Sequence, residues 1–488
     1  MEIGLTINGL FIAVLGTIYG IFLGILPGFG AGSGIAISLP IIFLMSPLNA
    51  MVFAISLYAG ATYGAGIPAI LIGIPGSPAG AATVFDGYEM AKKGKAGEAL
   101  AIQATSSGIG SFISIVIFIL FSRQLVKIAL KFGSPEIFMV TLFGLTVLAA
   151  LDKDDMLKTL LAGTFGVALS TLGVDPFYGN PRMTFNLLYL FEGITMVPFM
   201  LGFFCISNML DLIDQKSIIL DDKANNKVQF KEIYYGILKT LKYKSEIIRG
   251  SLIGTFIGAL PGAGASIGAF VSYSQARNFS KHPEKFGTGI IEGIIAAETA
   301  NNATVGGSLI PTFTLGIPGS PAAAILMGVM MGMGLRPGPQ LFLSQFPLII
   351  NLSLYILICS ILLAIIGALV ARYLSRVVTM PLSVLIPIAI VTSSVGAFST
   401  RFALFDIGIM ILFGFVGYIM KKYKYSIAAA VLGFVIGPMA EKGFLQSISM
   451  SRGNYSIFFT RPTCIIIWIL ILVSLILPRI QFKKLKLQ

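Results

Sequence analysis

The sequence predicts an all-α polytopic membrane protein with about 10 to 12 transmembrane helices of about 20 apolar residues each. Of its 488 residues, 56% are hydrophobic and only 11% are charged, and the mean hydropathy is +0.90. Residues 3–85 contain no Asp, Glu, Lys, Arg or His at all. Soluble domains carry roughly 25% charged residues, and a transmembrane β-barrel would show short alternating segments. Neither of these alternatives fits this chain.

A duplicated pair of motifs organises the chain. The motif L-P-G-x-G-A occurs at residues 26–31 and 260–265, and G-I-P-G-S-P-A occurs at 73–79 and 316–322. The first motif recurs after 234 positions and the second after 243, so the later copy carries about nine extra residues between its motifs. We therefore expect two homologous membrane repeats.

A polar segment separates the two copies of the motif pair. We expect a first membrane repeat at residues 1–213 with a hairpin near 60–85, and a second repeat at 250–488 with a hairpin near 299–335. The segment between them, 214–249, is expected to be a linker. Its apolar residues recur at helical intervals from Phe230 to Leu241, which also predicts an amphipathic helix on the cytoplasmic leaflet; the two interpretations are compatible.

Lys and Arg predict the orientation of the chain. The linker and the segment 479–486 are both basic, which assigns them to the cytoplasm. Residues 1–8 contain neither Lys nor Arg, so the N-terminus can start outside, which would make the two repeats inverted. Against this, the similarly placed segments Arg123–Lys131 and Arg372–Arg376 are both basic. Inverted topology is the favoured interpretation.

Gly and Pro inside long apolar stretches predict helices that are interrupted within the membrane. Non-helical backbone is tolerated there only where protein buries it or a water-filled cavity faces it, and paired interruptions in two repeats indicate a transporter's binding site. We expect each G-I-P-G-S-P motif to join two half-helices in a re-entrant hairpin, whose Gly, Ser and helix N-terminus suit a carboxylate. The alternative is that these residues form helix kinks and small-residue packing contacts. The expected substrate-binding residues are Gly28, Gly30, Pro75, Gly76, Ser77, Gly262, Gly264, Pro318, Gly319 and Ser320.

The second copy has an added polar cluster upstream of its hairpin, made of Glu298, Asn301, Asn302 and Thr304. Amide and hydroxyl oxygens suit Na⁺, whereas an intramembrane Glu suits a proton carrier or a structural hydrogen-bond partner. We expect ion coupling at these four residues, with Na⁺ at Asn301, Asn302 and Thr304 and with H⁺ as the alternative ion. The competing interpretation is that the amides are structural bridges. We expect no other metal and no cofactor.

Two further polar features lie outside these motifs. Asp86 follows the first hairpin and is expected to cap a following helix or to lie at the membrane interface. Asp175 and Arg182 lie in a polar stretch between apolar segments, where we expect them to form a structural ion pair.

Other functional classes are disfavoured. The net charge of +13 is spread over short basic clusters between apolar segments, so no nucleic-acid partner is expected. An enzyme is not expected either: no glycine loop carries a Walker lysine, and the one histidine, His282, lies in a polar loop. Cys205, Cys359 and Cys464 have no metal or redox spacing. A passive channel remains the serious alternative, because re-entrant loops also build selectivity filters.

At these motifs the sequence resembles the large membrane subunit of tripartite tricarboxylate transporters, the TctA family. The resemblance extends over nearly the whole chain and one departure is visible, since Ala65–Gly66 stands where the family often has Gly-Ser and so lacks a hydroxyl. The matching pieces are the two L-P-G-x-G-A motifs, Tyr58–Ala91, Gly173–Phe185, Pro283–Gly293, Ala297–Ala303, Thr314–Ser320, Arg336–Phe342 and Gly437–Glu441.

The resemblance implies more than the residues themselves do. It implies secondary uptake of citrate-like tricarboxylates or dicarboxylates by symport with a cation, in a multi-pass protein of the prokaryotic plasma (inner) membrane. It also implies two partners: a small membrane subunit of about four helices, and an extracytoplasmic solute-binding protein that delivers the substrate. An elevator-type movement of a hairpin-bearing domain is expected by similarity to other binding-protein-dependent secondary transporters.

Overall fold

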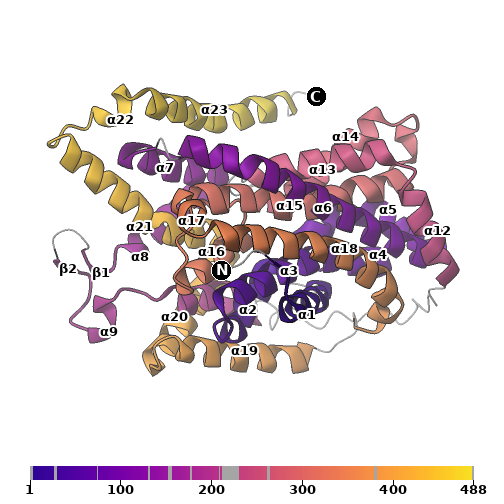
Figure 1. Cartoon of the computed structure of the whole chain (residues 1–488), viewed down its shortest axis with the longest axis horizontal. Helices are drawn as coiled ribbons and strands as arrows, with labels where there is room; N and C mark the ends of the chain where they lie inside the picture. The colour runs from indigo at the N-terminus through magenta and orange to yellow at the C-terminus, as the bar shows by residue number, and fades with distance from the viewer. Residues whose placement is uncertain are drawn as a thin grey trace.

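The computed structural model is built almost entirely of helices (Figure 1). It describes residues 4–26, 30–73, 75–129, 132–151, 156–175, 179–207, 209–210, 230–260, 264–377 and 382–485. Within these ranges the only sheet is a two-stranded antiparallel hairpin, β1 (Gly173–Val174) with β2 (Pro181–Arg182). The prediction of an all-α chain is therefore confirmed.

The helices fall on either side of the linker. Those before it are α1 (Ile7–Ile25), α2 (Ala31–Ile42), α3 (Pro47–Gly64), α4 (Gly66–Ile72), the short turn η1 (Pro78–Gly80), α5 (Ala81–Lys92), α6 (Ala96–Ala129), α7 (Ser134–Leu151), α8 (Met156–Ser170), α9 (Leu188–Phe191), α10 (Met196–Met200) and the π-helical turn η2 (Leu201–Ile206). Those from the linker onward are α12 (Phe230–Thr240), α13 (Lys244–Ala259), α14 (Gly264–Phe279), η3 (Pro283–Lys285), α15 (Ile291–Leu315), α16 (Pro321–Gly332), α17 (Pro339–Ser344), α18 (Phe346–Val377), α19 (Leu382–Ser399), α20 (Leu404–Lys422), α21 (Ile427–Met450), α22 (Ile457–Thr460) and α23 (Pro462–Leu485).

Glycines let α1 pack closely along α3. A methyl group on Gly20 would overlap the carbonyl oxygen of Leu57, and one on Gly24 would overlap that of Ala61. The same two close approaches recur between α13 and α15, where Gly254 meets Ala300 and Gly258 meets Thr304. The glycines are displaced by 234 positions and their partners by 243, as the duplicated motifs are. In both helix pairs small residues bring the two backbones together.

The helices α3 and α15 run in opposite directions. Tyr58 of α3 bonds to Ser308 of α15, whereas Thr62, one turn later in α3, accepts a bond from Asn301, earlier in α15. The long helix α6 lies along α15 in the same direction (Figure 1), from the Ser107–Glu298 hydrogen bond to the contact of Phe118 with Phe313. On the other side, α18 runs along α1 and α3, with Tyr355 against Thr6 and Cys359 against Ser56.

Five helical stretches of the described chain are long and apolar enough to cross a membrane. They are Ile7–Ile25, Pro47–Ile72, Ala96–Lys127, Phe346–Val370 and Leu404–Lys422. Several shorter apolar helices accompany them, among them α2, α8 and α16. The chain is thus a multi-pass α-helical protein by length and composition, and the expected number of 10 to 12 full spans stays a prediction.

The linker contains a helix where the apolar spacing predicts one. Helix α12 packs on the beginning of α6, where Gly236 meets the backbone of Glu98 and Lys239 forms an ion pair with the Glu98 carboxylate at 2.5 Å. Its Ile233 is buried, while Phe230 and Tyr234 are exposed. The next helix, α13, begins at Lys244, inside the segment expected to be linker. Residues 211–229 of the linker lie outside the described residues.

Each G-I-P-G-S-P motif lies between two helices, as expected: α4 and α5 flank the first motif, and α15 and α16 flank the second. In the first hairpin α4 ends at the left-handed Gly73 (φ 72°), and the Gly76 N–H bonds back to the Ala65 carbonyl at 2.9 Å. In the second, α15 ends at Gly316 (φ 70°) and the chain returns to Ser308, which Gly319 contacts. The motif residues between the helices are non-helical, because Gly ends the entering helix in a left-handed conformation and Pro has no N–H to continue it.

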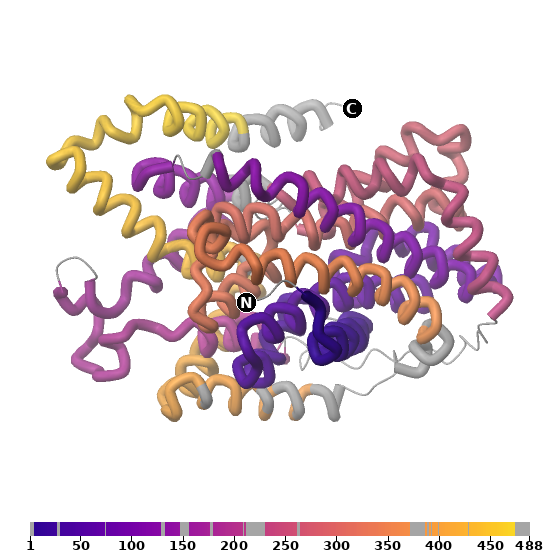
Figure 2. Tube along the Cα trace, in the orientation of Figure 1, coloured from indigo at the N-terminus to yellow at the C-terminus, as the bar shows by residue number. Residues whose placement is uncertain are grey.

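The hairpin of β1 and β2 projects from one end of the bundle together with α9 (Figure 2). Helix α23 packs against α7 and is held there by the buried carboxylate of Glu136 at the beginning of α7. That carboxylate bonds to Arg461 at 2.7 Å and to the Thr463 hydroxyl at 2.6 Å. These contacts join the beginning of α7 to the beginning of α23 and leave most of α23 at the periphery.

Candidate functional site

The two G-I-P-G-S-P motifs form matching tips deep in the helix bundle. Each tip packs against the end of the helix that precedes the L-P-G-x-G-A break of its own half, which is α1 in the first half and α13 in the second. A methyl group on Gly76 would overlap the carbonyl oxygen of Gly24, and one on Gly319 would overlap that of Gly258. Only glycine allows so close an approach of two backbones. The predicted residues Pro75–Ser77 and Pro318–Ser320 therefore lie in equivalent surroundings.

Each break leads into a helix that packs against the tip of the other half. Helix α2, which follows the first break, packs on α16, and its Gly32 faces Ala322 and Ile325. Helix α14, which follows the second break, packs on η1 and α5 behind the first tip. The predicted Gly30 also lies beside Ser77, since a methyl group added to Gly30 would lie 3.8 Å from the Ser77 side chain. Gly28 and Gly262 lie outside the described residues.

Four helices begin at these interruptions. They are α2 after Gly30, α14 at Gly264, α5 behind Ser77 and α16 behind Ser320. Gly264 has a left-handed backbone (φ 68°) and open space where a side chain would be. The first N–H groups of a helix have no partner within it, and the helix dipole makes this end positive. The arrangement thus gathers hydrogen-bond donors and positive potential without Lys or Arg in either motif.

The two tip serines differ in their contacts. Ser320 is buried, its oxygen accepts from the Ala323 N–H at 3.1 Å, and it shares a hydrogen bond of 2.7 Å with the Tyr58 hydroxyl. Tyr58 also lies 3.3 Å from the Ser308 hydroxyl. Ser77 is partly exposed and makes no capping bond to the turn that it precedes. Tyr58 was not predicted as a site residue, because its reach to the opposite tip depends on tertiary packing.

Glu298 is fully buried at the contact between the two halves. Its carboxylate accepts hydrogen bonds from the hydroxyls of Thr83 on α5 and, at 2.9 Å, Ser107 on α6. The side-chain amides of Asn301 and Gln103 lie within its reach. Thr83, Gln103 and Ser107 were missed in the sequence because single polar residues in a long apolar helix give no motif. The run of Gln103 to Ser107 in α6 was the available signal.

Asn301 and Asn302 both turn their amide nitrogens toward α3. The Asn301 nitrogen donates to the Thr62 carbonyl at 3.2 Å, and the Asn302 nitrogen to that of Ala59 at 3.1 Å. Both side chains are fully buried, and their amide oxygens have no hydrogen-bond partner among the described residues. The structure therefore brings Glu298, Asn301 and Asn302 to the face of α15 that meets the first half.

Thr304 lies on a different side of α15. Its hydroxyl donates to the Asn301 carbonyl at 2.6 Å, and its methyl group faces Gly268 of α14. Its carbonyl oxygen meets Gly258 of α13. The structure thus brings Thr304 to the helices of its own half rather than to the contact between halves where the Asn301 and Asn302 amides lie.

Asp86 lies within α5 and holds the loop that leads into α15. Its carboxylate accepts from three N–H groups of that loop, those of Gly287, Gly289 and Ile290, at 2.8–3.0 Å. It also accepts from the Tyr273 hydroxyl at 2.8 Å. Asp86 therefore connects the first hairpin to the second half through this loop, and the helix cap that was one of the expectations for it is not what it forms.

A family model for the tripartite tricarboxylate transporter TctA family matches residues 10–432 of this chain. The chain belongs to the TctA family. It is thus a transporter subunit and a multi-pass membrane protein. The resemblance found in the motifs is confirmed.

Two relatives of this TctA-family chain come from Agrobacterium vitis. An uncharacterized 52.8 kDa protein in the TAR-I ttuC′ 3′ region is 34% identical over 476 residues, which cover 96% of this chain and 93% of that protein. An uncharacterized protein in the TAR-II ttuC′ 3′ region is 35% identical over 234 residues, covering 47% of this chain and 97% of that protein. No solved structure matches.

The motif Gly173–Phe185 of this TctA-family chain forms the projecting β-hairpin. As expected, Asp175 and Arg182 form an ion pair, and Arg182 also binds Glu441 of α21. Both carboxylates raise the pKa of the Arg182 guanidinium above its ordinary value, Asp175 first through its hydrogen bond. The pair ties this loop to the bundle, which fits the structural role predicted for it.

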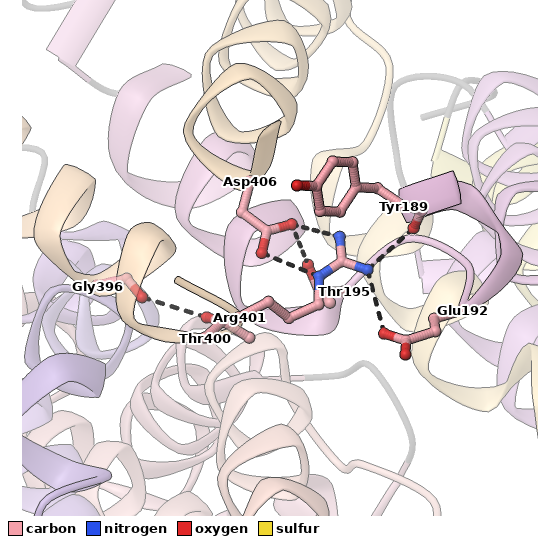
Figure 3. A network of polar contacts seen from close by, with 7 residues as sticks. All are labelled: Tyr189, Glu192, Thr195, Gly396, Thr400, Arg401 and Asp406. Atoms are coloured by element: carbon pink, nitrogen blue, oxygen red, sulfur yellow. Dashed lines mark hydrogen bonds and ion pairs between the residues drawn. The ribbon is translucent and has the colours of Figure 1, made fainter. Parts of the chain in front are cut away.

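A second arginine holds the other end of the same loop (Figure 3). Arg401 binds the buried carboxylate of Asp406 through two nitrogens, at 2.5 and 3.0 Å, and donates to the Tyr189 carbonyl at 3.0 Å. Its guanidinium also lies 3.5 Å from Glu192, and Asp406 accepts from Thr195 at 3.1 Å. The segment from β1 to α10 is thus fixed to α20 and α21 at two points.

Proposed function

We propose that this chain is the permease subunit of a binding-protein-dependent secondary transporter. It takes up carboxylates, either citrate-like tricarboxylates or dicarboxylates, by symport with a cation. The observation that carries this proposal is the meeting of the two tips with four helix N-termini in one region of the bundle. Each exposed helix N-terminus favours an anion by about 0.3–1 kcal/mol, and more where it is partly buried.

The substrate site that we propose lies at the two tips and the two breaks. Its residues are those expected from the sequence: Gly28, Gly30, Pro75, Gly76, Ser77, Gly262, Gly264, Pro318, Gly319 and Ser320. Small residues here leave backbone N–H groups open to a ligand, and the tip serines add hydroxyl groups. A carboxylate needs such donors, and a site of N–H groups releases an anion more readily than a site of fixed charges. The partly exposed Ser77 is the tip hydroxyl nearest to ligand access.

The two halves are proposed to be inverted repeats. The antiparallel run of α3 and α15 supports this, since residues 243 positions apart lie on helices that point in opposite directions. The matched close approaches of Gly24 and Gly258 support a common ancestral unit. Inverted repeats allow one site to open to either side of the membrane in turn. An elevator-type movement of the tip-bearing helices is the form of alternating access that we propose.

Coupling is proposed to reside in the second half, at Glu298, Asn301, Asn302 and Thr304. Na⁺ is the proposed ion and H⁺ the alternative. The burial of the first three residues between the halves supports a role in the movement of one half against the other. Thr304 contributes through the Asn301 carbonyl, which it holds by its hydroxyl.

We further propose the partners and the location that the family implies. The chain works in a bacterial plasma (inner) membrane with a small membrane subunit of about four helices and an extracytoplasmic binding protein that delivers the substrate. The basic segments of the linker and of residues 479–486 support a cytoplasmic position for both. The β-hairpin and α9 then face the extracytoplasmic side, where a binding protein would approach.

Uptake into proteoliposomes tests the proposed function. The chain is reconstituted with the two proposed partners, a small membrane subunit and a solute-binding protein, and labelled citrate and succinate are added with an inward Na⁺ or K⁺ gradient. We expect accumulation above equilibrium that needs both the Na⁺ gradient and the binding protein. A passive channel built on re-entrant loops would only equilibrate the label, and that outcome would replace our proposal.

A further inference from the structure

An apolar groove opens between α8 and α20, away from the tips and the breaks. Its volume is about 260 Å³. Ala162 and Met420 are buried, whereas Leu161 and Ile419 are about half exposed, so the groove has a packed floor and an open side. Its apolar lining consists of Leu161, Ala162 and Phe165 from α8 and Val416, Ile419 and Met420 from α20.

The groove lies at the end of the bundle opposite to the projecting β-hairpin. Helix α8 runs toward β1, and Leu161 lies in the half of α8 that is farther from it. Helix α20 runs the other way, because Asp406 in its first turn binds Arg401 beside the hairpin loop and Lys422 is its last residue. With the hairpin on the extracytoplasmic side, as proposed above, the groove ends at the cytoplasmic surface of the membrane.

Lysines and tyrosines surround that end of the groove, which we call its mouth. Tyr423 and Tyr425 line it. Lys158 of α8 donates from Nζ to the Tyr423 carbonyl at 3.2 Å, and the same ammonium lies 5.7 Å from the centre of the Tyr425 ring. Lys422 and Lys424 flank Tyr423 in the chain and are exposed. The mouth thus joins an apolar groove to a cluster of ammonium groups.

The end of α20 alone does not account for this cluster. Lys422 in the last turn of α20 complements the helix dipole, and basic residues are common in cytoplasmic loops. Lys158, however, lies in the first turn of α8, where the helix dipole disfavours a cation. Its position across the groove from Lys422 therefore needs another explanation, such as a shared anionic ligand.

We propose that this groove binds an anionic phospholipid, with one acyl chain in the groove and the headgroup phosphate among Lys158, Lys422 and Lys424. The groove follows α8 and α20 lengthwise, as an acyl chain in a bilayer does. Ammonium groups form charge-assisted hydrogen bonds with phosphate, and basic pockets between membrane helices on the cytoplasmic side bind anionic headgroups. A free phosphate would leave the apolar groove empty. Lipid binding does not rest on the proposed transport function.

The choice of headgroup can be tested by its net charge. The segment before α8 contains Asp152, Asp154 and Asp155, which lie outside the described residues. Carboxylates favour a headgroup that also carries an ammonium, as phosphatidylethanolamine does, whereas lysines favour phosphatidylglycerol. The two lipids share the phosphate and differ in net charge, so comparing them shows whether the lysines decide the preference.

The test is native mass spectrometry of the purified full chain in detergent, titrated with phosphatidylglycerol or with phosphatidylethanolamine of the same acyl chains. We expect several-fold higher apparent affinity for phosphatidylglycerol. Lys422→Gln combined with Lys424→Gln should lower that affinity by about 10- to 30-fold, since each lysine near an anionic surface contributes about fivefold. Leu161→Trp, which fills the groove from a half-exposed position, should weaken the binding of both lipids.

Matched controls separate the site from general charge and bulk. Lys281→Gln combined with Lys285→Gln removes the same charge from exposed positions in the loop before α15. Ile411→Trp adds the same bulk at a similarly exposed position of α20 outside the groove. Neither should change lipid affinity. Equal affinity for the two lipids overturns the proposal, as does unchanged phosphatidylglycerol affinity in the double variant at the mouth. A dimer that Leu161→Trp dissociates, with unchanged lipid binding, would assign the groove to a second copy of the chain instead.

Discussion

The two tips have the same sequence, G-I-P-G-S-P, yet different polar surroundings. Ser320 is buried and held by Tyr58 and by its own helix, whereas Ser77 is partly exposed and lacks a capping bond. The cause lies outside the motif. Position 58 in the first half corresponds to Asn301 in the second, and Ala65 corresponds to Ser308, each after 243 positions. The two tips therefore differ because the residues around them have diverged, although their own sequences have not.

The corresponding residues Tyr58 and Asn301 illustrate this divergence. Tyr58 reaches across to the tip of the other half, whereas Asn301 stays within the contact between the halves and bonds to Thr62. Tyr58 thus holds the second tip by a hydrogen bond, whereas the equivalent residue Asn301 belongs to the proposed ion site. We infer that the first tip is the more adaptable one and that the second serves as its fixed counterpart. The following predictions test this difference.

The largest expected effect is the same for both tips. Gly76→Ala and Gly319→Ala each force a methyl group into a backbone carbonyl, of Gly24 and Gly258 respectively. Overpacking costs about 1–3 kcal/mol, and more where backbone must move. We expect both variants to lose most of the correctly folded protein, measured by size-exclusion chromatography in detergent. Gly408→Ala, with open space around it, is the control that should fold normally. A folded Gly319→Ala beside an unfolded Gly76→Ala would show that the tips are not packed alike.

Tyr58→Phe should separate the two tips. It removes the hydroxyl that binds Ser320 at 2.7 Å and lies near Ser308, in a fully buried position that water cannot refill. The loss of a buried hydrogen bond costs about 0.5–1.5 kcal/mol, and unpaired partners add to it. We expect a lower unfolding temperature and slower uptake. Tyr234→Phe, at an exposed tyrosine on α12, serves as the control. An unfolding temperature equal to that of the unaltered chain would contradict the locking role of Tyr58.

The serines should respond in opposite ways. Ser320→Ala removes a helix cap, which costs about 1 kcal/mol, and leaves Tyr58 with a weaker partner. Ser77→Ala removes no capping bond, so its unfolding temperature should change little, yet uptake should fall because this partly exposed serine belongs to the proposed substrate site. Unfolding curves and initial uptake rates of both variants provide the measurement. Unchanged uptake kinetics in both variants would remove the tips from the substrate site.

These expectations mark how far the sequence alone leads. Gly and Pro disclose where helices are interrupted, so the tips at Pro75–Ser77 and Pro318–Ser320 were found correctly. The path of the chain within each break is not visible in sequence, because it depends on the left-handed Gly73 and Gly316 and on the bond from the Gly76 N–H to the Ala65 carbonyl. Local chemistry is visible in sequence, whereas the path after a break is decided by packing.

The polar cluster around Glu298 shows the same limit. Glu298, Asn301 and Asn302 were predicted as a cluster, but their partners Gln103 and Ser107 come from a helix about 190 positions away. Thr304 was grouped with them by adjacency. Two residues along a helix are about 200° around its axis, so Thr304 points away from Asn302 toward α13 and α14. Adjacency in sequence is therefore a poor guide to a shared site on a helix.

The smallest effect on stability is expected from Gly30→Ala. This variant tests whether the first tip, with its partly exposed Ser77, lines the substrate site. A methyl group there would lie 3.8 Å from the Ser77 side chain, an ordinary contact, and the backbone of Gly30 (φ −85°) suits any residue. Gly30→Ala should therefore leave the unfolding free energy within about 0.5 kcal/mol of that of the unaltered chain, as surface-like substitutions do. If Ser77 and Gly30 line the substrate site, the same methyl group should raise the KM for the carboxylate several-fold while kcat changes less. Gly30→Ala with unchanged KM, together with normal uptake by Ser77→Ala, would place the substrate elsewhere and leave the exposure of this tip without a role in transport.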